Sequence, residues 1–286
     1  MSTKVTIQDV KAAKTEGRKL VMVTAYDYPF GLLADQAGVD MVLVGDSLGM
    51  VVMGLDGTVG VTVENMIHHI KAVVRGCKRP LVVGDMPFMS YNTSIRDAIV
   101  NAGRLMKEGG CDVVKLEGGV DFATTIQAVV KAGIPVQGHI GLTPQTASAL
   151  GGFKMQGRDS AAAKQIIEDA RALQQAGVFS IVLEAVPAPL GKLVAEAVTV
   201  PIIGIGAGVD VDGQVLVTHD MLGLFDKFVP KFVKQYTQIR TTILEAMNAY
   251  KEDVRAGSFP AQEHSFKMPE ETLEQLKKEL LAYSDY

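Results

Sequence analysis

The chain has no tryptophan, only two cysteines, and few aromatic residues, which make up 6% of its 286 residues. Cys77 and Cys111 lie far apart and show no metal-site spacing, so we expect two reduced and mostly buried thiols. No uninterrupted apolar run reaches the roughly 18 residues that a membrane span requires. The N-terminal segment also lacks the apolar core of a secretory signal. We therefore expect a cytoplasmic protein without a membrane partner.

An excess of positive charge is missing as well. The sequence holds 28 Lys and Arg against 32 Asp and Glu, which gives a formal net charge of −4. Because nucleic-acid binding through bulk charge requires a basic surface, we expect no nucleic-acid partner. Hydrophobic residues account for 48% and charged residues for 21%, a balance that excludes wholesale disorder and allows a large core.

Short apolar runs alternate along the chain with longer stretches in which apolar residues recur every three or four positions. This alternation is typical of repeated βαβ units around a parallel sheet. The runs are rich in Val, Ile and Leu, as expected of strands that are buried on both faces. Eight such runs are present, at residues 19–27, 41–47, 80–85, 112–117, 134–139, 180–184, 200–204 and 214–220.

Eight strands in order, each mostly followed by a helix, predict an α/β protein with a single (βα)8 TIM barrel. The helical period is clear in four stretches, each ending in a glycine that suits a left-handed helix cap: residues 63–76, 94–110, 121–133 and 160–177. The alternative, a doubly wound sheet, needs fewer strands and usually a glycine-rich turn after the first strand, which is absent here.

The predicted catalytic domain is the barrel over residues 1–266, with an N-terminal helix and a closing helix over residues 231–256. Residues 267–286 form a helical tail that we do not expect to be a separate domain. Two connections are unusually long, residues 49–61 and residues 143–159. Both are glycine-rich and follow the carboxyl end of a strand, so we expect them to act as lids or binding loops at the mouth of the barrel.

Nearly every predicted strand ends in an ionisable group. Barrel enzymes carry their active-site groups at the carboxyl ends of the strands. Buried charges are costly unless they are paired or bound to a metal, so this concentration indicates a site rather than packing alone. The groups are Asp27, Asp46, Asp85, Lys115, Glu117, His139, Glu184, His219 and Asp220.

Asp46, Asp85 and Glu117 end the second, third and fourth strands. Neighbouring strands lie about 4.8 Å apart, so the three carboxylates can converge. Converging carboxylates repel one another unless a cation lies between them, and an all-oxygen site favours Mg²⁺ or another hard divalent ion. We therefore predict a metal site here; the alternative for each residue alone is a turn or a helix cap.

Four further residues suggest how a substrate is handled. Lys115 shares a strand face with Glu117, and it either forms an ion pair or stabilises negative charge on a substrate oxygen. Ser47 could hold a substrate carboxylate. Glu184 lies across the mouth among apolar neighbours and is the candidate general base, with a salt bridge to a loop as the alternative. His139 lies between them and could hydrogen-bond the substrate or a carboxylate.

Ten blocks of the sequence, in order, resemble the 3-methyl-2-oxobutanoate hydroxymethyltransferase family, also called ketopantoate hydroxymethyltransferases. The blocks are VTAYDYPFGLLAD (23–35), VGDSLGMV (44–51), GDMPFMSY (84–91), VKLEGG (114–119), GHIGLTPQ (138–145), GGFKMQGR (151–158), LEAVP (183–187), IGIGAG (203–208), DGQVLVTHD (212–220) and AGSFPAQEHSF (256–266). The sequence departs from the family at MGLDGT (53–58), where a G-H-D-S-T pattern is more usual, and at Gly191, where alanine is common.

The resemblance implies transfer of a hydroxymethyl group from 5,10-methylenetetrahydrofolate to 3-methyl-2-oxobutanoate, giving 2-dehydropantoate for pantothenate and coenzyme A synthesis. It also implies a cytoplasmic homo-oligomer, commonly a decamer. By resemblance, Glu184 is the proton acceptor. The residues at Mg²⁺ are Asp46, Asp85 and Glu117, and the residues that bind the 2-oxo acid are Asp46, Ser47, Asp85 and Lys115.

Two other functions fit the same residues. A metal-dependent 2-oxo acid lyase on the same barrel would share the enolate chemistry but would need no folate. A non-catalytic barrel that senses a 2-oxo acid would have no need of a general base.

Overall fold

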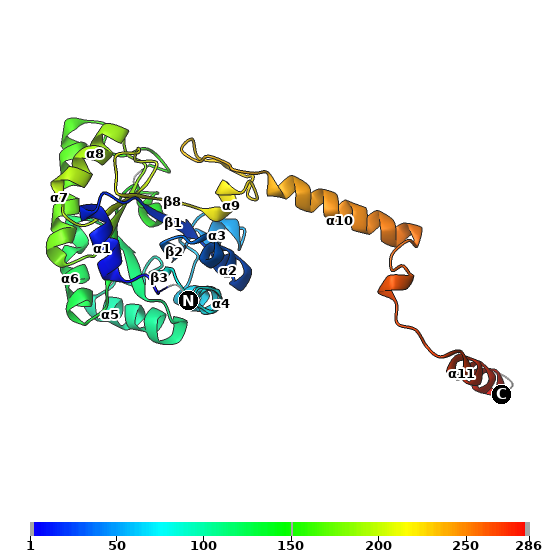
Figure 1. The fold of residues 1–286 in the computed structure, drawn as a ribbon. Coiled ribbons are helices and arrows are strands. Elements are labelled where there is room, and N and C mark those ends of the chain that lie inside the picture. Colours follow the sequence, from blue (N-terminus) through cyan, green and yellow to red (C-terminus); the bar gives the residue numbers. More distant parts are fainter. Residues whose placement is uncertain (1–2, 150, 284–286) are drawn as a thin grey trace. The chain divides into compact units, whose positions relative to one another are not determined.

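Eight parallel strands close into a barrel in chain order, with helices on its outside (Figure 1). The computed structural model describes residues 3–149 and 151–283. The predicted α/β class and the (βα)8 barrel are confirmed. The strands are β1 (Leu20–Thr24), β2 (Met41–Val44), β3 (Leu81–Asp85), β4 (Val113–Glu117), β5 (Val136–Gly141), β6 (Ser180–Glu184), β7 (Ile202–Ile205) and β8 (Gly213–Leu216).

The helices follow the predicted order, beginning with the expected N-terminal helix. They are α1 (Ile7–Thr15), α2 (Tyr28–Ala37), α3 (Leu48–Val51), α4 (Val63–Gly76), α5 (Ile95–Arg104), α6 (Ala123–Lys131), α7 (Ser160–Ala176), α8 (Ala188–Ala197), α9 (Thr218–Met221), α10 (Ile239–Ala256) and α11 (Glu270–Tyr283). A π-helical turn, η1 (Leu105–Gly109), continues α5, and the short 3₁₀ helices are η2 (Val120–Phe122), η3 (Pro144–Thr146) and η4 (Gln262–His264).

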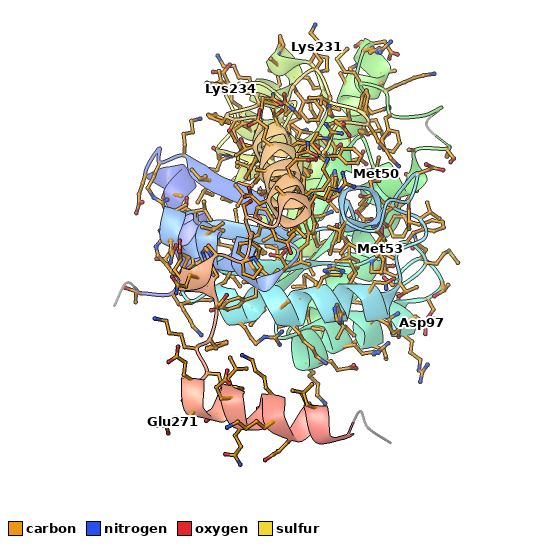
Figure 2. All side chains as sticks on the ribbon, turned by 90° about the vertical axis from the view of Figure 1, so that its right-hand side faces the viewer. Met50, Met53, Asp97, Lys231, Lys234 and Glu271 are labelled. Atoms are coloured by element: carbon orange, nitrogen blue, oxygen red, sulfur yellow. The ribbon has the colours of Figure 1, made fainter. Side chains whose placement is uncertain are left out.

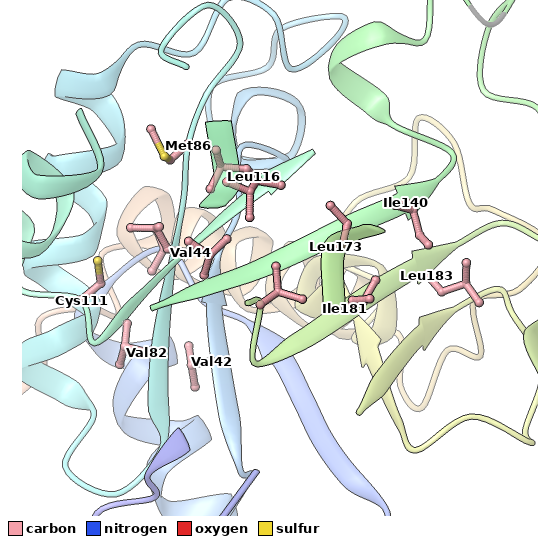
Figure 3. Close-up of a cluster of buried hydrophobic side chains, with 14 of the residues drawn as sticks. Val42, Val44, Val82, Met86, Cys111, Leu116, Ile140, Leu173, Ile181 and Leu183 are labelled. Atoms are coloured by element: carbon pink, nitrogen blue, oxygen red, sulfur yellow. The ribbon is translucent and has the colours of Figure 1, made fainter. Parts of the chain in front are cut away.

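Alternate residues of each strand face the barrel interior and the surrounding helices. In β2, Met41 and Leu43 belong to the cluster inside the barrel, whereas Val42 and Val44 belong to the larger cluster between barrel and helices. Figure 3 shows part of that outer cluster, which includes the buried Cys111. Both cysteines are free and buried, as predicted.

The eighth strand is shorter than predicted. It ends at Leu216, and the chain then turns into α9, so His219 and Asp220 lie on a helix rather than at a strand end. The turn is fixed by β1, because the Thr218 N–H donates to Thr24 Oγ1 at 2.9 Å and the Thr218 hydroxyl donates to the Thr24 carbonyl.

The chain divides into two compact units, Met1–Thr237 and Gln238–Tyr286. The first unit contains the barrel and the second contains α10 and α11, so the C-terminal extension is helical as expected. The predicted closing helix begins at Ile239 rather than at residue 231. The compact barrel unit also ends before residue 266, so our placement of the domain boundary stays a prediction. Among the described residues, no helix combines the length and hydropathy needed to cross a membrane.

Three of the four predicted glycine caps are confirmed. Gly110, Gly133 and Gly177 have φ of +88°, +88° and +97°, in the left-handed region that favours glycine. Gly76 is different, because it is the last residue of α4 and touches the backbone of α2. A Cβ on Gly76 would lie 2.6 Å from Leu32 N and 2.7 Å from Tyr28 O. Close approach of two helices, and not a left-handed cap, requires glycine there.

The variant Gly76→Ala should lower the free energy of unfolding by about 1–3 kcal/mol, because the added methyl group overpacks the contact between α2 and α4. Urea unfolding followed by circular dichroism measures the change. The control is Gly103→Ala in α5, where nothing lies within 4 Å of the new Cβ. This control should leave stability unchanged or raise it by about 0.5–1 kcal/mol. Equal losses in both variants would contradict the role of close packing at Gly76.

Candidate active site

A pocket opens at the carboxyl ends of the strands and encloses about 1030 Å³, including the part open to solvent. This volume is large enough for a small acid together with part of a second molecule. All the residues that we predict for catalysis, metal binding and substrate binding line this pocket: Asp46, Ser47, Asp85, Lys115, Glu117, His139 and Glu184.

The register of the parallel strands brings these residues together. Asp85 is paired with Lys115 between β3 and β4, and Glu117 is paired with His139 between β4 and β5. Glu184 ends β6 beside Gly141 of β5. Asp46 does not end β2 as predicted, because the strand ends at Val44 and Asp46 follows it in the next turn. Since all the strands are parallel, side chains at or near their carboxyl ends can still reach one volume at the mouth of the barrel.

Lys115 is the buried cation of the site. Its Nζ lies 2.9 Å from Asp85 Oδ1 and 3.1 Å from His139 Nδ1. Burial alone would lower the pKa of Lys115, but the carboxylates of Asp85, Glu117 and Asp46 outweigh it and raise the pKa above the ordinary value. The ammonium therefore stays charged, and the ion pair that we considered for Lys115 is present.

The three predicted metal ligands are almost completely buried. Burial, followed by repulsion from Asp85, raises the pKa of Asp46 to about 8. Burial also raises the pKa of Glu117 well above its ordinary value, against the opposing effect of Lys115 and with repulsion from Asp46 and Asp85. Three carboxyl groups thus face a single ammonium, and the cluster has a strong tendency to bind protons or further cations.

The donor chemistry of this cluster fits a hard divalent cation, since every side-chain ligand is a carboxylate oxygen. Glu117 Oε1 is buried and accepts no hydrogen bond from any described residue. However, within residues 3–149 and 151–283 no three Asp, Glu, His or Cys side chains are arranged to share one metal ion. The oxygens of Asp85 and Asp46 instead bind the Lys115 ammonium and the Gln145 amide. The three-carboxylate metal site therefore stays a prediction.

Gln145 connects the cluster and is missing from our predicted set. Its Nε2 donates to Asp46 Oδ2 and to the Met86 carbonyl, each at 2.9 Å. Its Oε1 accepts from the Tyr91 hydroxyl at 2.6 Å, and its backbone N–H donates to Glu117 Oε2 at 3.1 Å. Gln145 is uncharged and lies after the end of β5, so it is not among the ionisable groups that end the predicted strands. Its place at the end of the GHIGLTPQ block is the one signal in the sequence.

Glu184 faces the cluster from β6. Burial raises the pKa of Glu184 to about 7, Lys115 opposes this shift and Asp85 adds to it. Glu184 Oε2 lies 3.2 Å from His139 Nε2. Burial, reinforced by Lys115, lowers the pKa of His139 well below its ordinary value, so this histidine is neutral and does not pair with Glu184 as a cation. A carboxyl group whose pKa lies near neutrality is suited to accept a proton from a substrate.

The backbone directly after Glu184 is strained. Ala185 has a φ of +49°, a conformation that residues with a Cβ rarely adopt. Its N–H donates to the Ile205 carbonyl at 2.8 Å, and its carbonyl accepts from the Gln156 N–H at 2.9 Å. These bonds hold the turn that directs Glu184 toward the pocket, and such strain is concentrated at functional sites.

Ser47 lies at the start of α3, and its hydroxyl is 2.8 Å from the hydroxyl of Tyr26. Because α3 runs to Val51, the long connection over residues 49–61 begins as a helix. Both long connections line the pocket, the first through Met50 and Val51 and the second through Phe153. Figure 2 labels Met50 on this connection. The position of both loops at the mouth is confirmed, whereas their closure as lids stays a prediction.

Two of the nine strand-end groups lie outside the pocket lining. Asp27 caps α2, and its Oδ1 accepts from the Phe30 N–H at 2.8 Å. The ring of His219 packs against Tyr26 and Phe30, with centroid distances of 5.3 and 5.4 Å. Asp220 does line the pocket, although it reaches it from α9.

Comparison with known proteins gives one consistent family. The sequence model of the family described as ketopantoate hydroxymethyltransferase matches residues 4–262. The chain is 59% identical over 265 residues to 3-methyl-2-oxobutanoate hydroxymethyltransferase of Moorella thermoacetica, covering 93% of this chain and 98% of that one. It is 54% identical over 273 residues to the Carboxydothermus hydrogenoformans protein of the same name, covering 96% and 99%.

Solved structures with low sequence identity share the fold. Phosphonopyruvate hydrolase in complex with oxalate and Mg²⁺ matches with a TM-score of 0.61 at 13% identity, covering 99% of this chain and 98% of that one. A 2,3-dimethylmalate lyase of the PEP mutase/isocitrate lyase superfamily matches with a TM-score of 0.58 at 15% identity, covering 99% and 100%. At these identities the likeness concerns the barrel alone.

Gln145→Ala should lower the free energy of unfolding by about 1–3 kcal/mol, because the O–H of the buried Tyr91 loses its acceptor and one Asp46 oxygen loses its donor. Chemical denaturation measures the loss. Gln127→Ala on the exposed face of α6 is the control and should change stability by no more than about 0.5 kcal/mol. If both variants unfold at the same denaturant concentration as the parent protein, Gln145 does not connect the cluster.

Proposed function

Because the chain belongs to the ketopantoate hydroxymethyltransferase family, it is a 3-methyl-2-oxobutanoate hydroxymethyltransferase that forms ketopantoate in pantothenate biosynthesis, and we propose how its buried site performs this reaction. The family match decides against the lyase and the sensor. We propose 5,10-methylenetetrahydrofolate as the one-carbon donor. A cytoplasmic location and a homo-oligomer, a decamer by family resemblance, stay predictions.

The reaction poses one main chemical problem, which is removal of a proton from the carbon beside a ketone near neutral pH. The observation that carries the proposal is the position and pKa of Glu184. This carboxylate lines the same pocket as Lys115 and Asp85, and its pKa of about 7 allows it to accept a proton from C3 near neutral pH. The carbon that has lost its proton then forms a bond to the methylene carbon of the folate. Both bonds from that methylene carbon to folate nitrogens are broken in the overall reaction, and water supplies the hydroxyl group, so that tetrahydrofolate leaves.

Other residues of the pocket supply the groups that bind the 2-oxo acid. The Lys115 ammonium is the buried positive charge there, and it would stabilise negative charge that develops on the keto oxygen. The Ser47 hydroxyl can donate to the substrate carboxylate. His139 is neutral and lies between Lys115 and Glu184, where it can orient both side chains or the substrate.

Asp46, Asp85 and Glu117 are the residues that would hold Mg²⁺. Their oxygens are hard ligands. The pKa of Asp46 and of Glu117 is raised first by burial and then by repulsion between the carboxylates, and a divalent cation would relieve that repulsion. When bound, the ion would act as a Lewis acid toward the keto acid.

Glu184→Gln should slow deuterium exchange at C3 of 3-methyl-2-oxobutanoate by about 10²- to 10⁴-fold. The exchange is measured by NMR with Mg²⁺ and without folate. Binding of the keto acid should persist, because glutamine preserves the shape of the side chain. In the parent enzyme the exchange rate should rise as the pH passes through about 7, since only ionised Glu184 accepts a proton. Glu196→Gln, an exposed change on α8, is the control. Undiminished exchange in Glu184→Gln would remove this residue from the role.

Binding of Mg²⁺ should release protons, because Asp46 with a pKa of about 8 is largely protonated at neutral pH and must ionise to bind the ion. Isothermal titration calorimetry in buffers of different protonation enthalpy counts the protons released. The affinity should rise as the pH increases toward about 8. Binding heats that are equal in all buffers, or an affinity independent of pH, would contradict a site built on these carboxylates.

A further inference from the structure

Asp220 is a carboxylate in the pocket that the mechanism above does not use. It is 8% exposed and lines the pocket, and none of the described residues donates a hydrogen bond to its side chain. Burial raises the pKa of Asp220 to about 6, so the group is mostly ionised at neutral pH. A buried and unpaired carboxylate is costly, and a ligand that supplies hydrogen-bond donors would offset that cost.

The position of Asp220 is fixed from several sides. The two hydrogen bonds between Thr218 and Thr24 tie the start of α9 to β1. His219 packs against the rings of Tyr26 and Phe30. The following loop closes back on α9, since the Leu224 N–H donates to the His219 carbonyl at 2.8 Å. Asp220 is therefore held on a rigid element facing the pocket, as a preorganised binding group is.

The surroundings of Asp220 differ from the rest of the pocket. The groups for the keto acid and its proton come from the sector between β2 and β6. The remaining sector, from β7 through β8 to the loop after α9, contributes mainly apolar side chains, among them Ile205, Val215, Val217, Phe225 and Phe232. Within the described part of the pocket lining, Asp220 is the ionisable group of this sector.

We propose that Asp220 binds the pterin ring of the folate co-substrate, through the ring's 2-amino group and the adjacent ring N–H. These two donors lie side by side, and a carboxylate can accept both at once, as it does from a guanidinium. The flat faces of the ring match apolar and aromatic walls, such as Phe225 and Phe232. The sector lines the same pocket as Glu184, the residue that takes the proton from the attacking carbon in the proposed mechanism. The inference rests on the proposed function, because it takes folate as the co-substrate.

Asp220→Asn tests the assignment, because asparagine keeps the shape but replaces one acceptor with a donor. The KM for methylenetetrahydrofolate should rise roughly 10- to 100-fold, as expected for the loss of hydrogen bonds to a charged group. Folate-independent exchange at C3 of the keto acid should stay at the parent rate, which also shows that the variant is folded. Asp210→Asn, an exposed change between β7 and β8, is the control and should alter neither value.

A folate analogue that lacks the 2-amino group identifies which atoms Asp220 binds. The parent enzyme should discriminate against this analogue by a factor similar to the effect of Asp220→Asn, and the variant should discriminate little. An unchanged folate KM in the variant, or equal discrimination by both proteins, would overturn the proposal. A loss of keto-acid exchange in Asp220→Asn would overturn it too, by placing Asp220 in the keto-acid site. If the parent enzyme showed no exchange, the proposed mechanism would fail, and the folate KM comparison would still decide the role of Asp220.

Discussion

Repulsion among three buried carboxyl groups that share one ammonium is the constraint on which the site depends. Asp46, Asp85 and Glu117 face one pocket, and Lys115 is the cation buried among them. Charges in such surroundings must be neutralised by protons, by hydrogen-bond donors or by cations. The raised pKa of Asp46 and of Glu117 favours neutralisation by protons. The hydrogen bond from the Gln145 side-chain amide to Asp46 provides a donor. The same demand makes the cluster suitable for a divalent ion, and it keeps Lys115 charged, as our proposed role for this residue requires.

Charged and apolar residues line different parts of the pocket at the mouth of the barrel. The segment after β2 and strands β3 and β4 supply the carboxylates and the ammonium, and β6 supplies Glu184, the general base that we propose. The sector from β7 to α9 is mostly apolar, with Asp220 as its charged group. This division fits two substrates whose reacting carbons must meet, because in our proposal each would bind to a different wall of the pocket. A parallel barrel achieves this arrangement readily, since all its strands end at one face.

Much of this arrangement is predictable from the sequence, because strands buried on both faces read as apolar runs and the charged residues that end them stand out. The eight strands and the charged residues predicted for the site follow from that pattern, whereas the uncharged Ser47 is predicted only from its place after Asp46 and from the family resemblance. Gln145 does not, because it is uncharged and its partner Asp46 lies 99 residues away. The end of β8 depends on the contact between Thr24 and Thr218, which are 194 residues apart, and no local pattern reveals it. For the same reason, the helical period of α10 predicts a helix without indicating that the compact barrel unit ends before it.

The most direct test of the central claim is a crystal structure of the protein with Mg²⁺ and 3-methyl-2-oxobutanoate. The account predicts one metal ion with oxygens of Asp46 and Asp85 at about 2.0–2.1 Å, Glu117 beside it, and the Glu184 carboxylate facing C3 of the keto acid from the opposite side. A metal ion bound elsewhere, or a keto acid whose C3 faces away from Glu184, would contradict it.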